Sequence, residues 1–132
     1  MTQAKGTFEV KVAPLPLDAG AQDSTPGRMS LDKQFHGDLE ATGKGQMLTA
    51  GNPGGSGAYV AIERVTGTLH GRNGSFVLQH SGTMTRGQAQ MTIAVVPDSG
   101  AGELAGLSGN LSIQIVEGKH FYNFDYTLPD AS

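Results

Sequence analysis

Two side chains that can exchange protons, Glu63 and His80, fall on the predicted apolar face of a β-hairpin. The hairpin runs from Tyr59 to Met84, and both halves are rich in β-branched and aromatic residues. A buried carboxylate beside an imidazole suits proton transfer, because each group favours the charged form of the other. The same pair also occurs as a structural contact within a core, so both interpretations stay open.

The separation of Glu63 and His80 depends on where the chain turns. The segment 71–74 ends in Asn-Gly, the strongest short signal for a hairpin turn. A four-residue turn would place His80 opposite Val65 and make Glu63 its diagonal neighbour, roughly 7–8 Å away. A two-residue turn at Asn73-Gly74 would separate the pair by roughly 13 Å. Only the first register allows a direct or water-bridged pair.

Either turn has an even number of residues, so one face of the hairpin combines odd residues of the first strand with even residues of the second. This face is apolar apart from Glu63, His80 and one phenol, whereas the opposite face is mixed and wettable. The first face is therefore predicted to line the core or a ligand site. The inward-facing side chains that we expect to contact a ligand are Tyr59, Phe76, Leu78, Met91, Tyr122 and Tyr126.

Period-two alternation extends over most of the chain and predicts an all-β fold in one domain, residues 1–132. The long alternating run 28–47 is split near Gly37-Asp38, because strands rarely exceed roughly ten residues. One strongly bent strand with a glycine bulge is the alternative. The predicted strands cover 6–13, 28–37, 38–47, the two arms of the 59–84 hairpin, 88–96, 110–116 and 120–128. Eight strands joined mostly by short turns favour an antiparallel up-and-down barrel, closed so that no edge is exposed.

Lys33 is the one cation on the apolar parity of its strand. An unpaired lysine is rarely buried completely. We therefore expect its stem to lie on the core while the ammonium reaches solvent at a barrel rim. A cation inside the lumen is the functional alternative.

Metal and cofactor chemistry finds little support. His120 could join Glu63 and His80 in a two-His-one-carboxylate site, but no close ligand spacing supports it, and we expect no metal. Gly100-x-Gly102-x-x-Ala105 matches the dinucleotide fingerprint, yet a β-run follows where a helix must begin. We therefore read residues 97–109 as a structural connection over a barrel end. With no cysteine, P-loop or nucleophile elbow, no cofactor is expected.

The composition limits the classes of partner. The formal net charge is −3, which gives no basic footprint for nucleic acid. No apolar run approaches a membrane span and no signal peptide is visible, so a cytoplasmic protein is expected. The outer face of the hairpin carries Val60, Ile62 and Val77, more apolar than a solvated face needs. This favours a homo-oligomer, more readily a dimer than a trimer.

Three stretches carry a family resemblance: YVAIERVTGTLHGRNGSFVLQHSG, the 97–109 segment and the ending HFYNFDYTL. Together they resemble the bacterial family known as domain of unknown function 3224. More remotely, the second half is similar in layout to allene oxide cyclase barrels. That similarity implies a closed eight-stranded barrel with an apolar lumen. It carries over no reaction, because the site residues of the plant cyclases, which bind a fatty-acid epoxide, are not matched here.

Two functions are therefore expected. The first is binding of a small apolar or amphipathic molecule in the barrel lumen. The second is a cofactor-free isomerase, cyclase or lyase in which Glu63 and His80 transfer protons. A barrel filled entirely by side chains, with a structural role, is a third and weaker alternative.

Overall fold

The chain folds into β-strands connected by turns. The structure, a computed structural model, describes residues 2–15, 27–51 and 54–129. Within these ranges there is no helix, which confirms the predicted all-β class, and hence no helix that could cross a membrane. The strands are β1 (Thr2–Pro14), β2 (Gly27–Gly37), β3 (Leu39–Gly51), β4 (Gly57–Leu69), β5 (Arg72–Thr85), β6 (Gln88–Val95), β7 (Ala101–Gly102), β8 (Ser108–Val116) and β9 (Lys119–Thr127).

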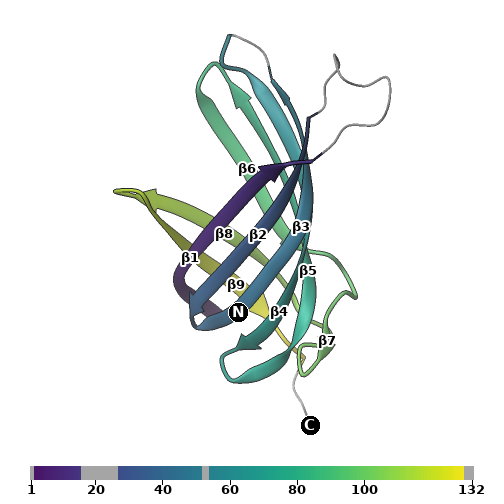
Figure 1. The fold of residues 1–132 in the computed structure, drawn as a ribbon. Coiled ribbons are helices and arrows are strands. Elements are labelled where there is room, and N and C mark those ends of the chain that lie inside the picture. Colours follow the sequence, from purple (N-terminus) through teal and green to yellow (C-terminus); the bar gives the residue numbers. More distant parts are fainter. Residues whose placement is uncertain (1, 16–26, 52–53, 130–132) are drawn as a thin grey trace.

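Eight of these strands form a closed antiparallel barrel, as predicted (Figure 1). Their order is β4-β3-β2-β1-β9-β8-β6-β5, and the pairing of β4 with β5 joins the two ends of the sheet. The sequence did not predict β7, which lies outside this ring and pairs with β5. The break between β2 and β3 falls at Asp38, where the sequence places it.

The turn of the central hairpin differs from both predicted registers. His70 and Gly71 form it, with φ angles of 47° and 81°. Positive φ at both positions is what a two-residue type I′ turn requires. Asn73 instead lies within β5 opposite Thr68, and its backbone N–H donates to the Glu103 carboxylate at 3.0 Å. The parity is unchanged, so the predicted division between inner and outer faces is confirmed by burial along both strands.

Aromatic side chains fill the barrel near this turn. Phe35 packs against Phe8 and Tyr122, with ring centroids 5.7 Å apart in each pair. Leu104 and Leu107, from the connection 97–109, are buried in the same core. That connection is therefore a plug over the barrel end, as predicted, and this end is called the filled end below.

The opposite end of the barrel opens because β6 and β8 diverge. Within the described residues the two strands pair at Ala94 and Asn110 alone. Beyond this point residues 57–62 of β4, 79–85 of β5 and 88–93 of β6 continue as an arm that stands away from the β8–β9 hairpin (Figure 1). This region is called the open end.

Candidate functional site

Glu63 and His80 are in direct contact within the barrel. Nε2 of His80 lies 2.8 Å from Oε1 of Glu63, and both side chains are buried. Glu63 pairs across β5 with Leu78, and His80 pairs across β4 with Ala61. The two residues are therefore diagonal neighbours, although in neither of the two registers expected from the sequence. The contact itself is the direct pair that the proton-transfer hypothesis needs.

Lys33 completes this cluster, and the expectation that its ammonium reaches solvent is wrong. Its side chain is 5% exposed, and Nζ lies 3.2 Å from Oε1 of Glu63. The ammonium also lies over two aromatic rings, 5.1 Å from the centroid of Phe8 and 5.7 Å from that of Phe35. A partner carboxylate and two ring faces offset the desolvation that disfavours an unpaired buried lysine. Lys33, Glu63 and His80 are called the polar cluster below.

A glycine in β3 makes the contact between Lys33 and Glu63 possible. Lys33 lies in β2 and Glu63 in β4, so β3 runs between them, and Gly43 stands directly opposite Lys33. A Cβ added at Gly43 would lie 2.0 Å from Oε2 of Glu63 and 2.9 Å from its Cδ. Any larger residue would therefore occupy the space that the carboxylate fills.

Two acceptor atoms of the polar cluster have no hydrogen-bond partner among the described residues. One is Oε2 of Glu63, which is fully enclosed and faces Gly43. The other is Nδ1 of His80, which also lacks a partner but is not fully enclosed. Since Nε2 of His80 faces a carboxylate, that nitrogen carries the proton in the neutral ring and Nδ1 is left as an acceptor.

His120 does not join this cluster. Its ring packs on Phe8, with centroids 5.0 Å apart, at the start of β9. Among the residues that the structure describes, no three His, Cys, Asp or Glu side chains gather as a metal site would require. His36 and His70 lie on the outer face and in the hairpin turn, where their ring nitrogens lie 3.6–3.7 Å from carboxylate oxygens of partly exposed residues.

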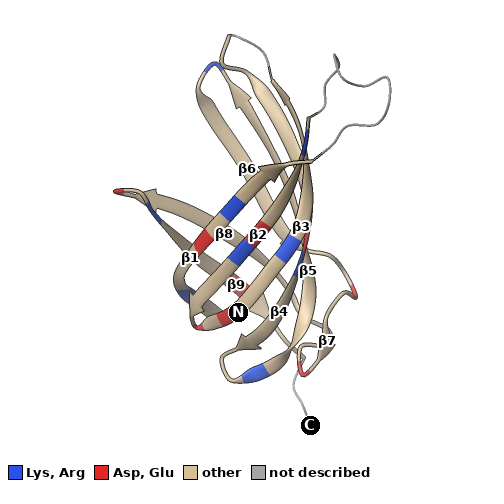
Figure 2. Cartoon of the chain, in the orientation of Figure 1, with Lys and Arg blue, Asp and Glu red and all other residues tan. Residues whose placement is uncertain are grey.

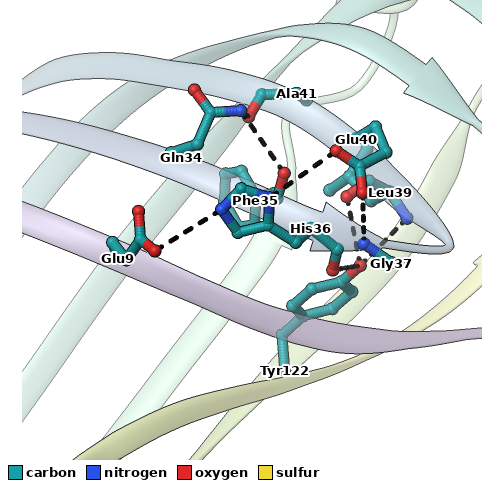
Figure 3. Close-up of polar contacts among 9 residues, drawn as sticks. All are labelled: Glu9, Gln34, Phe35, His36, Gly37, Leu39, Glu40, Ala41 and Tyr122. Carbon is teal, nitrogen blue, oxygen red and sulfur yellow. Dashed lines mark hydrogen bonds and ion pairs between the residues drawn. The ribbon is translucent and has the colours of Figure 1, made fainter.

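Tyr122, a predicted ligand contact, joins β9 to the β2–β3 turn (Figure 3). Its hydroxyl accepts from the backbone N–H of Leu39 at 2.9 Å and donates to the carbonyl of His36 at 2.9 Å. Burial raises the pKa of this phenol, the Leu39 amide opposes the rise, and the charges of Asp38 and Glu40 add to it. The bonding capacity of the hydroxyl is thus used within the protein.

Three other predicted ligand contacts also lie in the filled end. Phe76 and Leu78 are fully buried in the main core, and the Phe76 ring stacks on Phe124. The hydroxyl of Tyr126 is hydrogen-bonded to the ring of His70, and burial raises its pKa. These side chains hold the fold together on the far side of the polar cluster.

Tyr59 and Met91, the remaining predicted contacts, lie in the open end. They border a cleft of about 420 Å³ on the inner face of the arm. Its inward-facing side chains are Tyr59, Met84, Ala89 and Met91. Figure 2 shows the arm almost free of charged residues, and residues 57–62, 79–85 and 88–93 contain no Asp, Glu, Lys or Arg. The cleft therefore has an apolar wall.

The cleft begins at the Tyr59–Gly82 pair, the next inner-face pair after His80 along β4 and β5. Along the inner face of β5, Gly82 follows His80, and Tyr59 stands opposite Gly82. A Cβ added at Gly82 would lie 2.4 Å from Cε1 of Tyr59, so the ring lies flat against the glycine backbone. Burial raises the pKa of the Tyr59 phenol. The Tyr59 ring thus covers Gly82, the inner-face residue of β5 between His80 and Met84.

Comparison of the chain with known proteins identifies its family. The model of a family described as Protein of unknown function (DUF3224) matches residues 4–126. The chain belongs to this family. A DUF3224 family protein of unknown function from Shewanella oneidensis MR-1 is 51% identical, its crystal structure superposes with a TM-score of 0.91, and the match covers 99% of each chain. No curated protein matches. The solved DUF3224 relative has the same fold, and its function is unknown as well.

Sequence reasoning missed Lys33 as the partner of Glu63. The signal that could have found it is the pair of glycines at 43 and 45 on the inner parity of β3, which leaves a gap in the wall between β2 and β4. A buried cation and a buried anion on either side of a glycine gap are near enough to pair.

Proposed function

We propose that this DUF3224 barrel binds a small apolar or amphipathic molecule at its open end. The observation that carries the proposal is the uncharged cleft of about 420 Å³ bordered by Tyr59, Met84 and Met91. The two methionines are 43% and 48% exposed although they face inward. Contiguous exposed apolar surface of this kind marks interaction sites, and the mouths of β-barrels are frequent ligand sites.

Methionine is a suitable residue for such a wall. Met29 and Met47 stand opposite each other on the inner faces of β2 and β3, and Met84 and Met91 face inward from the arm. Unbranched, polarisable side chains adapt to ligands of different shape, which is why binding surfaces of broad specificity use them. The packed filled end supplies the rigid base from which this adaptable wall extends.

The proposal is tested with a neutral apolar fluorophore, N-phenyl-1-naphthylamine, which brightens in apolar surroundings. We expect saturable binding by the wild type and at least about tenfold weaker binding by Met91→Glu, which places a charge in the cleft. Val116→Glu is the matched control, because Val116 is 46% exposed, close to the 48% of Met91, and lies outside the cleft. The proposal would be contradicted if all three proteins bound the dye equally well, or if the wild type did not bind it.

A second candidate function is proton transfer by the Glu63–His80 pair. The observation that favours it is the 2.8 Å contact, which leaves Nδ1 of His80 as an available base. A carboxylate that orients a histidine is a recurring device for this chemistry. Its test is incubation of an enolisable ketone of matching length, 2-decanone, with the protein in deuterated water. Carbon-bound deuterium formed by the wild type and not by His80→Gln would support it; binding without incorporation would remove it.

A further inference from the structure

Resting on the proposed function, we infer that the polar cluster is the head-group subsite of the cleft and selects a neutral hydroxyl donor. The expected ligand class is an amphipathic alcohol or phenol, whose hydroxyl donates to Nδ1 of His80 while its apolar part lies against Tyr59 and Met91. The carboxylate, ammonium and methyl-ether analogues of the same length are expected to bind more weakly.

The charge balance of the cluster argues for a neutral head group. Lys33 and Glu63 form an ion pair at 3.2 Å, with both side chains almost completely buried. An added carboxylate would lie near the Glu63 carboxylate, and an added ammonium near the Lys33 ammonium. Neither would find an uncommitted counter-charge, and bringing an unpaired charge out of water is strongly unfavourable.

The free atom of the cluster argues for a donor. Nε2 of His80 is committed to Oε1 of Glu63 at 2.8 Å, which holds the neutral ring in the tautomer whose Nδ1 accepts. Oε2 of Glu63 is the other unpartnered acceptor, but it is enclosed against Gly43 and leaves no room for a ligand atom. A ligand hydroxyl can donate to Nδ1, whereas an ether oxygen only accepts and would leave that nitrogen unpaired.

The dimensions of the open end fit a chain of moderate length. His80, Gly82 and Met84 follow one another on the inner face of β5. At about 3.3 Å per residue, His80 and Met84 are about 13 Å apart along the strand. A linear chain of about ten carbons covers this distance, provided that the Tyr59 ring shifts away from Gly82 to admit the head group.

The test compares 1-decanol with its isomer 1-methoxynonane, which has the same atoms and no donor. Each competes with N-phenyl-1-naphthylamine, and the ratio of the two dissociation constants is measured in wild type and in His80→Phe. We expect the preference for the alcohol to fall about tenfold in the variant, as a single lost hydrogen bond allows. The difference in hydration of the two probes cancels in this double comparison.

A second measurement does not depend on the variant folding. In wild-type protein labelled with ¹⁵N-histidine, 1-decanol should move the Nδ1 resonance of His80 and leave Nε2 protonated, whereas 1-methoxynonane should leave both in place. An equal preference in wild type and variant, or an unmoved Nδ1 resonance at saturation, overturns the inference while the cleft still binds both probes. Failure of both probes and the dye to bind overturns the proposed function itself.

Discussion

Nε2 of His80 lies 2.8 Å from Oε1 of Glu63, and the same oxygen lies 3.2 Å from Nζ of Lys33. One carboxylate oxygen thus contacts both the His80 ring and the Lys33 ammonium, and the other has no hydrogen bond within the described residues. The cluster forms the boundary between a packed half of the barrel and an open half. The contribution of the polar cluster to fold stability and its contribution to ligand binding can therefore be tested with separate variants.

Replacing one member of the Lys33–Glu63 pair should destabilise the fold strongly. Glu63→Gln leaves a buried ammonium without a counter-charge, and Lys33→Met leaves a buried carboxylate, so each should lower the free energy of unfolding by about 3–5 kcal/mol. The double variant Lys33→Met/Glu63→Gln should lose much less than the sum, because no unpaired charge remains. Urea unfolding of the four proteins measures this, and additive losses would show that the pair is not coupled.

Gly43→Ala should also destabilise the protein, because the new methyl group would meet the Glu63 carboxylate at 2.0 Å. Overpacking of this kind costs about 1–3 kcal/mol. Gly51→Ala is the control, since a Cβ there meets its nearest atom at 3.7 Å. Thermal melts of the two variants should separate clearly. A melting temperature for Gly43→Ala that equals that of Gly51→Ala would mean that the glycine gap is not needed.

Tyr122 should make folding sensitive to alkaline pH. Burial raises the pKa of its phenol above 10.0, so the folded state keeps the proton over a range in which the unfolded state has lost it. Stability is then fully present below pH 10.0 and falls as pH rises through the raised pKa. Tyr59 and Tyr126, whose pKa values are also raised, contribute in the same direction.

Two variants isolate the role of Tyr122. Tyr122→Phe should be about 1–3 kcal/mol less stable at neutral pH, since the Leu39 N–H loses its buried acceptor. It should also lose less stability than the wild type between pH 9 and pH 11. Thr127→Ala, on the exposed side of β9, is the control and should follow the wild type. Urea unfolding midpoints measured across this pH range test the prediction. If the midpoints of wild type and Tyr122→Phe fell in parallel as pH rises, Tyr122 would not be the source of the alkaline sensitivity.

The outer face of the hairpin is proposed as a contact between two copies of the chain. Leu48, Val60 and Ile62 are 44%, 52% and 55% exposed and adjoin one another across β3 and β4. Light scattering at micromolar concentration should give the mass of a dimer for the wild type and of a monomer for Ile62→Glu. Val116→Glu should remain a dimer. A wild-type monomer would remove the proposal.

The sequence predicts much of this barrel because period-two burial is a local property. The inner parity of the 59–84 hairpin, the break at Gly37-Asp38 and the plug formed by residues 97–109 follow from residues close in the chain. The position of the turn did not follow, because Asn73-Gly74 is the better local signal. Gly74 is instead placed where a Cβ would meet the Ala101 carbonyl of β7 at 2.2 Å, a contact between distant segments.

The polar cluster could be predicted only in part. Glu63 and His80 share the inner face of two adjacent strands, so their proximity depends on register alone. Lys33 is two strands away from Glu63, and its pairing depends on the missing side chain at Gly43. The division of the lumen was beyond local patterns as well, because it arises where β6 and β8 stop pairing after Ala94 and Asn110.

The most direct test of ligand binding at the open end is a titration of protein labelled with ¹³C in its methionine methyl groups. Four of the five methionines, at positions 29, 47, 84 and 91, face inward around that end. With 1-decanol, the resonances of Met84 and Met91 should move saturably in wild type and in Val116→Glu. The single variants Met84→Ala and Met91→Ala identify the two resonances by their loss. In Met91→Glu, where binding is lost, the remaining Met84 resonance should stay in place. Methionine resonances that remain unmoved in the wild type at saturating 1-decanol would contradict the account.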